Sequence, residues 1–246
     1  PGRGGLDIFT GFFSRALTPA LTYEGADVPA GAPPLLVTVA AAAWRTVVFA
    51  IAGISLALVF GLVLGFLGST AWWEGDPGRG RRAVGPAVYA TVRVVIALSR
   101  SVHELLWAVL FLAALGFNTF AAVIAISIPY GGTLAKIFSE MVDEAARDSA
   151  RGLRAVGASP SIVFAFGLLP RALPDMIAYT FYRTECAVRS AAVLGFFGYR
   201  TLGYHVKASF DNLHYGEVWT YLYALFALVL LVDLTSSTVR RRFAAR

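Results

Sequence analysis

The sequence has little charge and almost no cysteine. Only 15% of its 246 residues are charged and 57% are hydrophobic, whereas an average soluble domain carries roughly 25% charged residues. A water-soluble fold of this composition would expose large apolar patches and aggregate. Cys186 is the single cysteine, which excludes an internal disulfide and a thiolate metal cluster. These shortages exclude an ordinary soluble domain.

The sequence also lacks the motifs of enzymes. It contains no Gly-rich loop ending in Lys-Ser or Lys-Thr, no Gly-x-Ser-x-Gly and no pair of active-site carboxylates. His103, His205 and His214 are scattered without the spacing of metal ligands. We therefore expect a protein that is not an enzyme and that has no metal or cofactor of its own.

Long uncharged runs are the strongest positive signal. Arg45 and Glu74 bracket 28 uncharged residues, and Glu104 and Lys136 bracket 31, each more than the ~20 that a helix needs to cross a bilayer. We predict an all-α polytopic membrane protein with a transmembrane domain over 44–246. Residues 1–43 are predicted to form an N-terminal extracytoplasmic or interfacial segment, which includes a short amphipathic helix near 9–21. The five spans of the transmembrane domain are expected at about 44–68, 86–115, 119–138, 173–197 and 218–239.

The basic residues orient these spans. One set of alternate loops holds twelve: Arg79, Arg81, Arg82, Lys136, Arg147, Arg151, Arg154, Arg171, Arg240, Arg241, Arg242 and Arg246. The opposite loops between spans hold only Arg200 and Lys207. Because basic residues accumulate on the cytoplasmic side, we expect a plasma-membrane protein with a cytoplasmic C-terminus. This asymmetry also explains the net charge of +6 without a nucleic-acid partner.

Small residues and prolines predict where helices touch or bend. Gly61, Gly65 and Gly68 are four and three residues apart, a spacing that lets another helix approach closely. Pro129-Tyr130-Gly131-Gly132 is expected to interrupt the third span and to free backbone carbonyls.

Seven charged residues fall within the second and fourth predicted spans. Besides Asp175, six of them are candidates for a translocation pathway or for ion pairs within the membrane: Arg93, Arg100, Glu104, Arg183, Glu185 and Arg189. The first three are seven and four residues apart, which predicts one shared helical face. The six residues either line a pathway for an anion or form ion pairs that orient helices, such as Glu104 with Arg189. Ion pairing is favoured, because a transporter should not hold its substrate tightly halfway.

About 35 residues join the third and fourth spans, too many for a simple turn. A short helix is predicted over 148–157, with Asp148 or Ser149 as its N-cap and Gly157 at the left-handed position that ends it. Leu153 and Val156 would form its apolar side. Ser159-Pro160 then restarts a helix, and Leu169-Pro170 and Pro174 are expected to end it.

This segment resembles the "EAA" signature of ABC-importer permeases, E-A-A-x3-G-x9-I-x-L-P. Gly157, eleven residues and then Leu169-Pro170 match its frame. Arg151-Gly152-Leu153 occupy the E-A-A positions and Gly167 the Ile position, so the usual acidic residue is replaced by an arginine. A literal Glu144-Ala145-Ala146 is rejected, because the residue six positions on is alanine.

Four further segments, 98–108, 136–140, 152–158 and 184–195, resemble the phosphonate branch of these permeases. The resemblance implies a type I permease fold and import of phosphonate, or a related phosphorus oxyanion, by alternating access. It implies a homodimer, two ATPase subunits that bind ATP and Mg, and an extracytoplasmic phosphonate-binding protein. Members often have one further N-terminal helix, which we expect before Pro1. The residues that would couple the permease to the ATPase are Arg151, Gly152, Leu153, Arg154, Ala155, Val156, Gly157, Ala158, Leu169 and Pro170.

Three alternatives remain open. An importer of the same class could carry phosphite, phosphate, methionine or polar amino acids. A self-sufficient carrier or channel would not require the short cytoplasmic helix. A membrane enzyme of lipid phosphonate chemistry is disfavoured by the missing acid–base or metal cluster.

Overall fold

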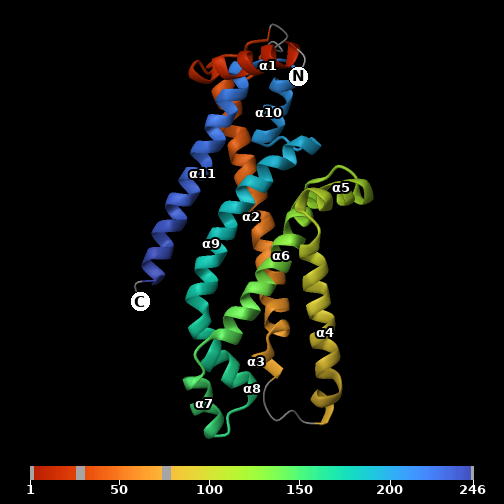
Figure 1. Cartoon of the computed structure of the whole chain (residues 1–246), viewed down its shortest axis with the longest axis vertical. Coiled ribbons are helices and arrows are strands. Elements are labelled where there is room, and N and C mark those ends of the chain that lie inside the picture. The colour runs from red at the N-terminus through yellow and green to blue at the C-terminus, as the bar shows by residue number, and fades with distance from the viewer. Residues whose placement is uncertain (1–2, 26–30, 74–78, 245–246) are drawn as a thin grey trace. The chain divides into compact units, whose positions relative to one another are not determined.

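The computed structural model describes residues 3–25, 31–73 and 79–244, and the regular elements among them are all helical (Figure 1). The all-α prediction is confirmed. Residues 26–30 and 74–78, the side chains of the basic residues at 79–82 and 240–242, and Arg246 lie outside this description. In chain order the elements are α1 (Arg3–Ser14), η1 (Arg15–Leu17), α2 (Leu35–Gly68), α3 (Thr70–Trp73), α4 (Arg79–Ser101), α5 (Glu104–Leu115), α6 (Thr119–Glu144), α7 (Asp148–Ala155), α8 (Pro160–Ile162), η2 (Val163–Leu168), α9 (Leu169–Val193), η3 (Leu194–Phe197), α10 (Leu202–Asp211) and α11 (Tyr215–Ala244).

Three of the described helices are long and apolar enough to cross a bilayer: α2, α6 and the Tyr215–Thr238 part of α11. α2 begins nine residues before the predicted start of the first span. α9 is continuous over 25 residues, but it carries five charged residues and is not apolar enough by the same measure. Whether α9 crosses the membrane, as the prediction of five spans requires, therefore stays a prediction.

The second predicted span is wrong as a single straight helix. The chain bends by 94° between the Gly85–Ser101 part of α4 and α5, and the pair makes at most one further broken span. His103 is extended at the N-cap of α5, where its Nδ1 accepts a hydrogen bond from Leu105 N at 3.3 Å. The indole of Trp107 donates back across the bend to Ser99 O at 3.3 Å. A local cap and a side-chain bond together fix this corner.

The chain forms two compact units. The first comprises Pro1–Ala50 and Val188–Asp233. Within it, the amphipathic N-terminal helix α1 packs against the start of α11: the rings of Phe12 and Trp219 lie 4.9 Å apart, and Trp219 Nε1 donates to Phe12 O at 2.8 Å. The buried carboxylate of Glu217 accepts hydrogen bonds from Ser209 Oγ and from the backbone of Glu24.

The second unit, Ile51–Ala187 with Leu234–Arg246, depends on close approach of α2, α4 and α6. A side chain at Gly61 would lie 2.6 Å from Leu134 Cβ, and one at Gly65 would lie 3.1 Å from the carbonyl oxygen of Ala135. The predicted small-residue face of α2 is thus confirmed, and α6 packs on it. Gly132 of α6 meets Ser99 of α4 in the same way.

The predicted interruption of the third span is wrong, because α6 continues through Pro129. Thr133 Oγ1 donates to Pro129 O at 2.9 Å, and the adjacent Gly131 packs against the backbone of Ala57 in α2. A tight reversal precedes α6: Gly116 has φ +73°, and Asn118 Oδ1 caps α6 by accepting from Ala121 N at 2.7 Å.

Candidate functional site

The α6–α9 connection contains the predicted short helix, α7, at Asp148–Ala155. Its N-terminus differs from the prediction, because Arg147 is the N-cap and no side chain caps the helix. Asp148 instead pairs with Arg151 at 2.5 Å (Oδ1 to Nη2), and Ser149 Oγ accepts from Arg171 Nη2 of α9 at 2.9 Å. Asp148 therefore pairs with an arginine of its own helix, and Ser149 connects α7 to α9, so neither side chain caps α7.

The C-terminus of α7 is closed as the sequence predicts. Gly157 has φ +80°, its N–H donates to Arg154 O at 3.0 Å, and Ala158 N donates to Leu153 O at 3.0 Å. This pair of bonds is the Schellman motif, which requires a left-handed residue that glycine adopts without strain. α8 then begins at Pro160, as predicted, with Ser159 O accepting from Val163 N.

α7 packs back on the segment that follows it. Six residues, Val163–Leu168, form a π-helical turn between α8 and α9. Gly167 in this turn lies so close to α7 that a Cβ would be 3.1 Å from Ala150 Cα and 3.3 Å from Leu153 Cδ1. Leu153 is accordingly half-buried, whereas Val156 is 81% exposed. The packed side of α7 is therefore formed by Ala150 and Leu153, whereas Val156, which was predicted to share it with Leu153, projects outward.

The predicted coupling residues therefore divide into an exposed and a packed set. Leu169 starts α9 and lines a small apolar cavity with Phe164 and Met176. Pro170 and Pro174 lie within the first turns of α9, so the expectation that they end a helix is wrong. The exposed set is Arg151, Gly152, Arg154, Ala155, Val156, Gly157 and Pro170, with Ala158 half-buried.

A carboxylate that the sequence did not single out holds the base of this region together. Asp143, near the end of α6, accepts hydrogen bonds from Ser69 Oγ at 2.6 Å, Thr70 N at 3.1 Å and Ala71 N at 3.0 Å. It therefore caps α3 from another helix. Trp72 of α3 in turn stacks edge-on with Phe164 at 5.7 Å. No sequence signal could reveal this link, because Asp143 and its partners are 72 to 74 residues apart.

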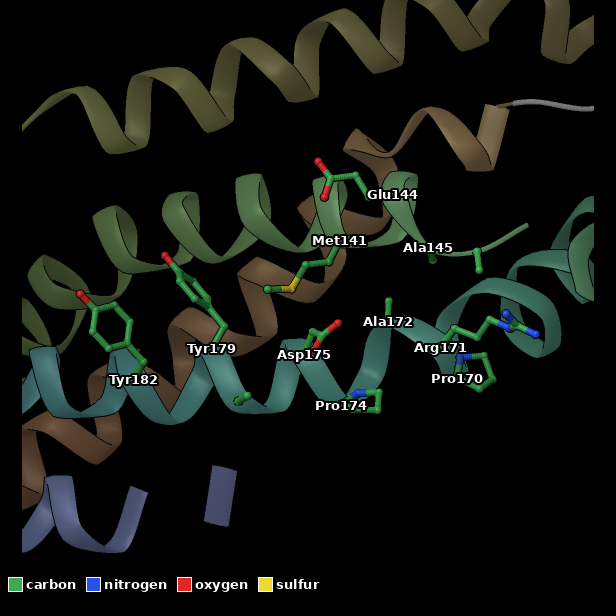
Figure 2. Close-up of a pocket in the computed structure, with 12 residues that line it drawn as sticks. Met141, Glu144, Ala145, Pro170, Arg171, Ala172, Pro174, Asp175, Tyr179 and Tyr182 are labelled. Atoms are coloured by element: carbon green, nitrogen blue, oxygen red, sulfur yellow. The ribbon is translucent and has the colours of Figure 1, made fainter. Parts of the chain in front are cut away.

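A hollow of about 850 Å³ lies beside this connection, between the end of α6 and the first turns of α9. Figure 2 shows Met141 of α6 and Tyr179 of α9 each extending toward the other helix. Asp175 and Arg171 also line it. Among the residues that the structure describes, no three His, Cys, Asp or Glu side chains lie close enough to share a metal ion.

The structure does not keep the six ionisable residues of the predicted spans together. The 94° bend separates Glu104 from Arg93 and Arg100, so the prediction of one shared helical face is wrong. Arg183 lies over the rings of Tyr130 and Tyr179, at 5.1 and 5.8 Å, and its Nε is buried without a hydrogen-bond partner. Glu185 and Arg189 remain about one turn apart on the continuous helix α9.

Comparison with known proteins decides the family. The model of the family described as "binding-protein-dependent transport system inner membrane component" matches residues 78–246. The chain belongs to this family. It is therefore a membrane-embedded subunit of a transport system, and the recognition made from the EAA-like frame is confirmed.

The curated relatives are transport permeases. The chain is 31% identical over 198 residues to the phosphite transport system permease protein PtxC of Stutzerimonas stutzeri, 26% over 197 residues to the phosphate-import permease protein PhnE of Mycolicibacterium smegmatis, and 30% over 121 residues to the putative cryptic phosphonate transport system permease protein PhnE2 of Escherichia coli. These alignments cover 80%, 80% and 49% of this chain. They cover 68%, 35% and 99% of the relatives' own length, so this permease spans only part of PtxC and of the Mycolicibacterium smegmatis PhnE.

Solved structures show the same fold. An inward-facing form of the MetNI methionine ABC transporter aligns with a TM-score of 0.72 at 20% identity, over 86% of this chain and 99% of that chain. At this identity the likeness concerns the fold alone. The predicted type I ABC-importer permease fold is confirmed.

Proposed function

We propose that this chain is the permease subunit of an ATP-driven importer that carries phosphonate, or a related phosphorus oxyanion, across the bacterial plasma membrane. Family membership supports the transport role. The names of the relatives, for phosphite, phosphate and phosphonate, support a phosphorus oxyanion as cargo, as does the resemblance of the sequence to the phosphonate branch. The basic loops support a cytoplasmic C-terminus.

The single observation that carries the mechanism is the form of α7. It is a short helix, closed by a Schellman motif at Gly157, that presents Val156 and Arg151 outward. An exposed apolar side chain and an exposed guanidinium on one short helix suit a groove on a partner protein. We propose that this groove belongs to an ATPase subunit, which binds ATP and Mg. Two such subunits would serve two copies of the permease, and an extracytoplasmic binding protein would deliver the substrate.

The contacts of α7 supply a route for the motion. Ser149 is bonded to Arg171 of α9, and Gly167 gives the close contact with Ala150. Asp143 ties the end of α6 to α3. A displacement of α7 by ATPase closure would therefore move the ends of α6, α9 and α3 together, which is the rocking that alternating access requires. Arg151, in place of the usual acidic residue, would meet a partner surface of opposite sign to that of other permeases.

Co-purification of the ATPase subunit with variants of this chain tests the coupling role. Val156→Asp should leave the permease folded, because the side chain is 81% exposed, but should weaken ATPase binding by about tenfold or more, because a carboxylate would be buried unpaired. Leu213→Asp is the matched control: it adds the same charge at a 62% exposed position in the first unit, with φ 60°, which aspartate tolerates. Equal recovery of ATPase with both variants would contradict the role of α7.

The substrate class has a separate test, because the binding protein of such an importer sets most of its selectivity. Calorimetric titration of the binding protein that co-purifies with the complex should give heat of binding with methylphosphonate, phosphite or inorganic phosphate. Binding of methionine or a polar amino acid in their place would leave the permease class intact and overturn the phosphorus oxyanion.

A further inference from the structure

A hollow of about 500 Å³ in the second unit is lined by three cationic side chains from two antiparallel helices. α4 supplies Arg93 and Arg100, two turns apart on one face, and α6 supplies Lys136. Ile96 and Ala97, which lie between the arginines, and Ser101 complete the lining. The register of α4 against α6 brings the cations together, because Gly132 lies against Ser99 and Ser139 receives a hydrogen bond from Arg93 Nη1 at 3.4 Å.

The charges in this hollow are not balanced by the described residues. Lys136 forms an ion pair with Glu140, one turn further along α6. Arg93 reaches the hydroxyl of Ser139 and the ring of Tyr89, whose centroid is 5.9 Å away. Among the residues that the structure describes, no carboxylate lies within ion-pair distance of either arginine. Two of its three positive charges, those of Arg93 and Arg100, therefore have no carboxylate in ion-pair contact among the described residues.

Such an arrangement is costly unless an anion occupies it. Three like charges repel one another, and ionisable groups in membrane helices mark functional sites because they are expensive to keep there. A guanidinium donates two parallel hydrogen bonds to the oxygens of a tetrahedral oxyanion, and a lysine adds a point charge. The separation of Arg93 and Arg100 by two helical turns, with Lys136 opposite, leaves room for one tetrahedral group between them.

We propose that Arg93, Arg100 and Lys136 form a binding site for a phosphorus oxyanion. The inference rests on the proposed function, which brings phosphorus oxyanions to this protein. The site adds Lys136 to the sequence-based grouping and omits Glu104, which lies beyond the bend. Its occupant has the chemistry of a phosphate group, which both the transported anion and the headgroup of an anionic lipid supply.

The test uses the complete complex of permease, ATPase and binding protein, with five single variants. Arg100→Gln and Lys136→Gln remove one charge each. Arg200→Gln and Lys207→Gln are matched controls, because Arg200 is an exposed arginine of the first unit and Lys207, like Lys136, pairs with a carboxylate four residues on. Recovery of ATPase with each variant first establishes that the complex is assembled. Arg100→Lys should retain part of the oxyanion binding that Arg100→Gln loses, because it keeps the positive charge.

Two measurements distinguish the sources of the oxyanion. In the first, uptake of radiolabelled inorganic phosphate and of methylphosphonate is measured in phosphatidylcholine proteoliposomes. In the second, thermal unfolding of the complex is measured in phosphatidylcholine nanodiscs with and without phosphatidylglycerol. A transported oxyanion predicts that Arg100→Gln and Lys136→Gln lose about tenfold or more in uptake efficiency relative to their controls. A lipid headgroup predicts normal uptake and loss of the stabilisation by phosphatidylglycerol.

Variants that equal their controls in both measurements would overturn the site. That outcome differs from failure of the proposed function, in which the wild-type complex itself would take up neither phosphate nor methylphosphonate or would contain no ATPase. Because the ATPase and the binding protein have phosphate sites of their own, only the differences between matched variants count.

Discussion

Replacing Gly157 by alanine should loosen α7, whereas the same substitution five residues earlier, at Gly152, should tighten it. A Cβ at either position would meet nothing within 4 Å, so neither change causes a clash. Gly157 has φ +80°, where an alanine costs about 1–2 kcal/mol. Gly152 lies inside the helix without such a φ, and alanine there should gain about 0.5–1 kcal/mol. The two variants should therefore differ by about 1.5–3 kcal/mol in the stability of one short helix.

Hydrogen exchange of α7 in the purified permease measures this difference directly. Local opening sets the exchange rate of protected amides, and 1.4 kcal/mol corresponds to tenfold. The amides of Gly157 and Ala158, which donate to Arg154 O and Leu153 O, should exchange about ten to a hundred times faster in Gly157→Ala than in Gly152→Ala after correction for intrinsic rates. Equal exchange in both variants would refute the Schellman closure. Uptake of phosphate or methylphosphonate by the complete complex should fall in Gly157→Ala and persist in Gly152→Ala.

Two further predictions concern stability. Asp143→Ala leaves the fully buried hydroxyl of Ser69 and two backbone N–H groups without their acceptor, so it should cost about 1–3 kcal/mol of stability and lower the melting temperature. The control Asp211→Ala breaks only an exposed pair with Lys207 and should cost less than about 1 kcal/mol. Equal losses of stability in the two variants would contradict the capping role of Asp143. Burial lowers the pKa of His205, and the charges of Arg200 and Arg45 lower it further, despite the opposing charge of Glu217. Above pH about 6.5 the imidazole is neutral in both states, so it does not affect the free energy of unfolding. Below that value the unfolded state takes up a proton that the folded state does not, so stability falls as the pH falls. His205→Phe retains a ring to stack on Tyr221 and should show a smaller fall in melting temperature between pH about 7 and 5.5; an identical fall would show that other groups cause it.

The features that the sequence predicted well depend on contacts close along the chain or on composition. The N–H groups of Gly157 and Ala158 close α7 by donating to residues three and five positions before them, respectively, so the left-handed conformation of Gly157 could be inferred locally. The glycines of α2 form a face at helical spacing, and that face packs on α6 as expected. Composition alone established a membrane protein. The EAA-like frame, together with the four further segments, predicted the permease family, which the family model confirms.

The predictions that failed concern positions where distant or competing contacts decide. The uncharged run over the second span continues through the bend, which a cap at His103 and the bond from Trp107 to Ser99 fix. Pro129 was expected to break α6, but a helix packed on neighbouring helices retains its path when the freed backbone groups find other partners. Asp148 was expected to cap α7, but Arg151 is within reach of its carboxylate.

The sequence by itself determined that this chain is helical, enters a membrane and carries a short, sharply ended helix between two long ones, because hydrophobic composition and glycine conformation act locally. Only the tertiary structure decided that Asp143 caps a helix 72 to 74 residues away and that Lys136 joins Arg93 and Arg100 around one hollow. Those groupings depend on the register of one packed helix against another, and register follows from the fit of side chains across the interface, which no single segment encodes.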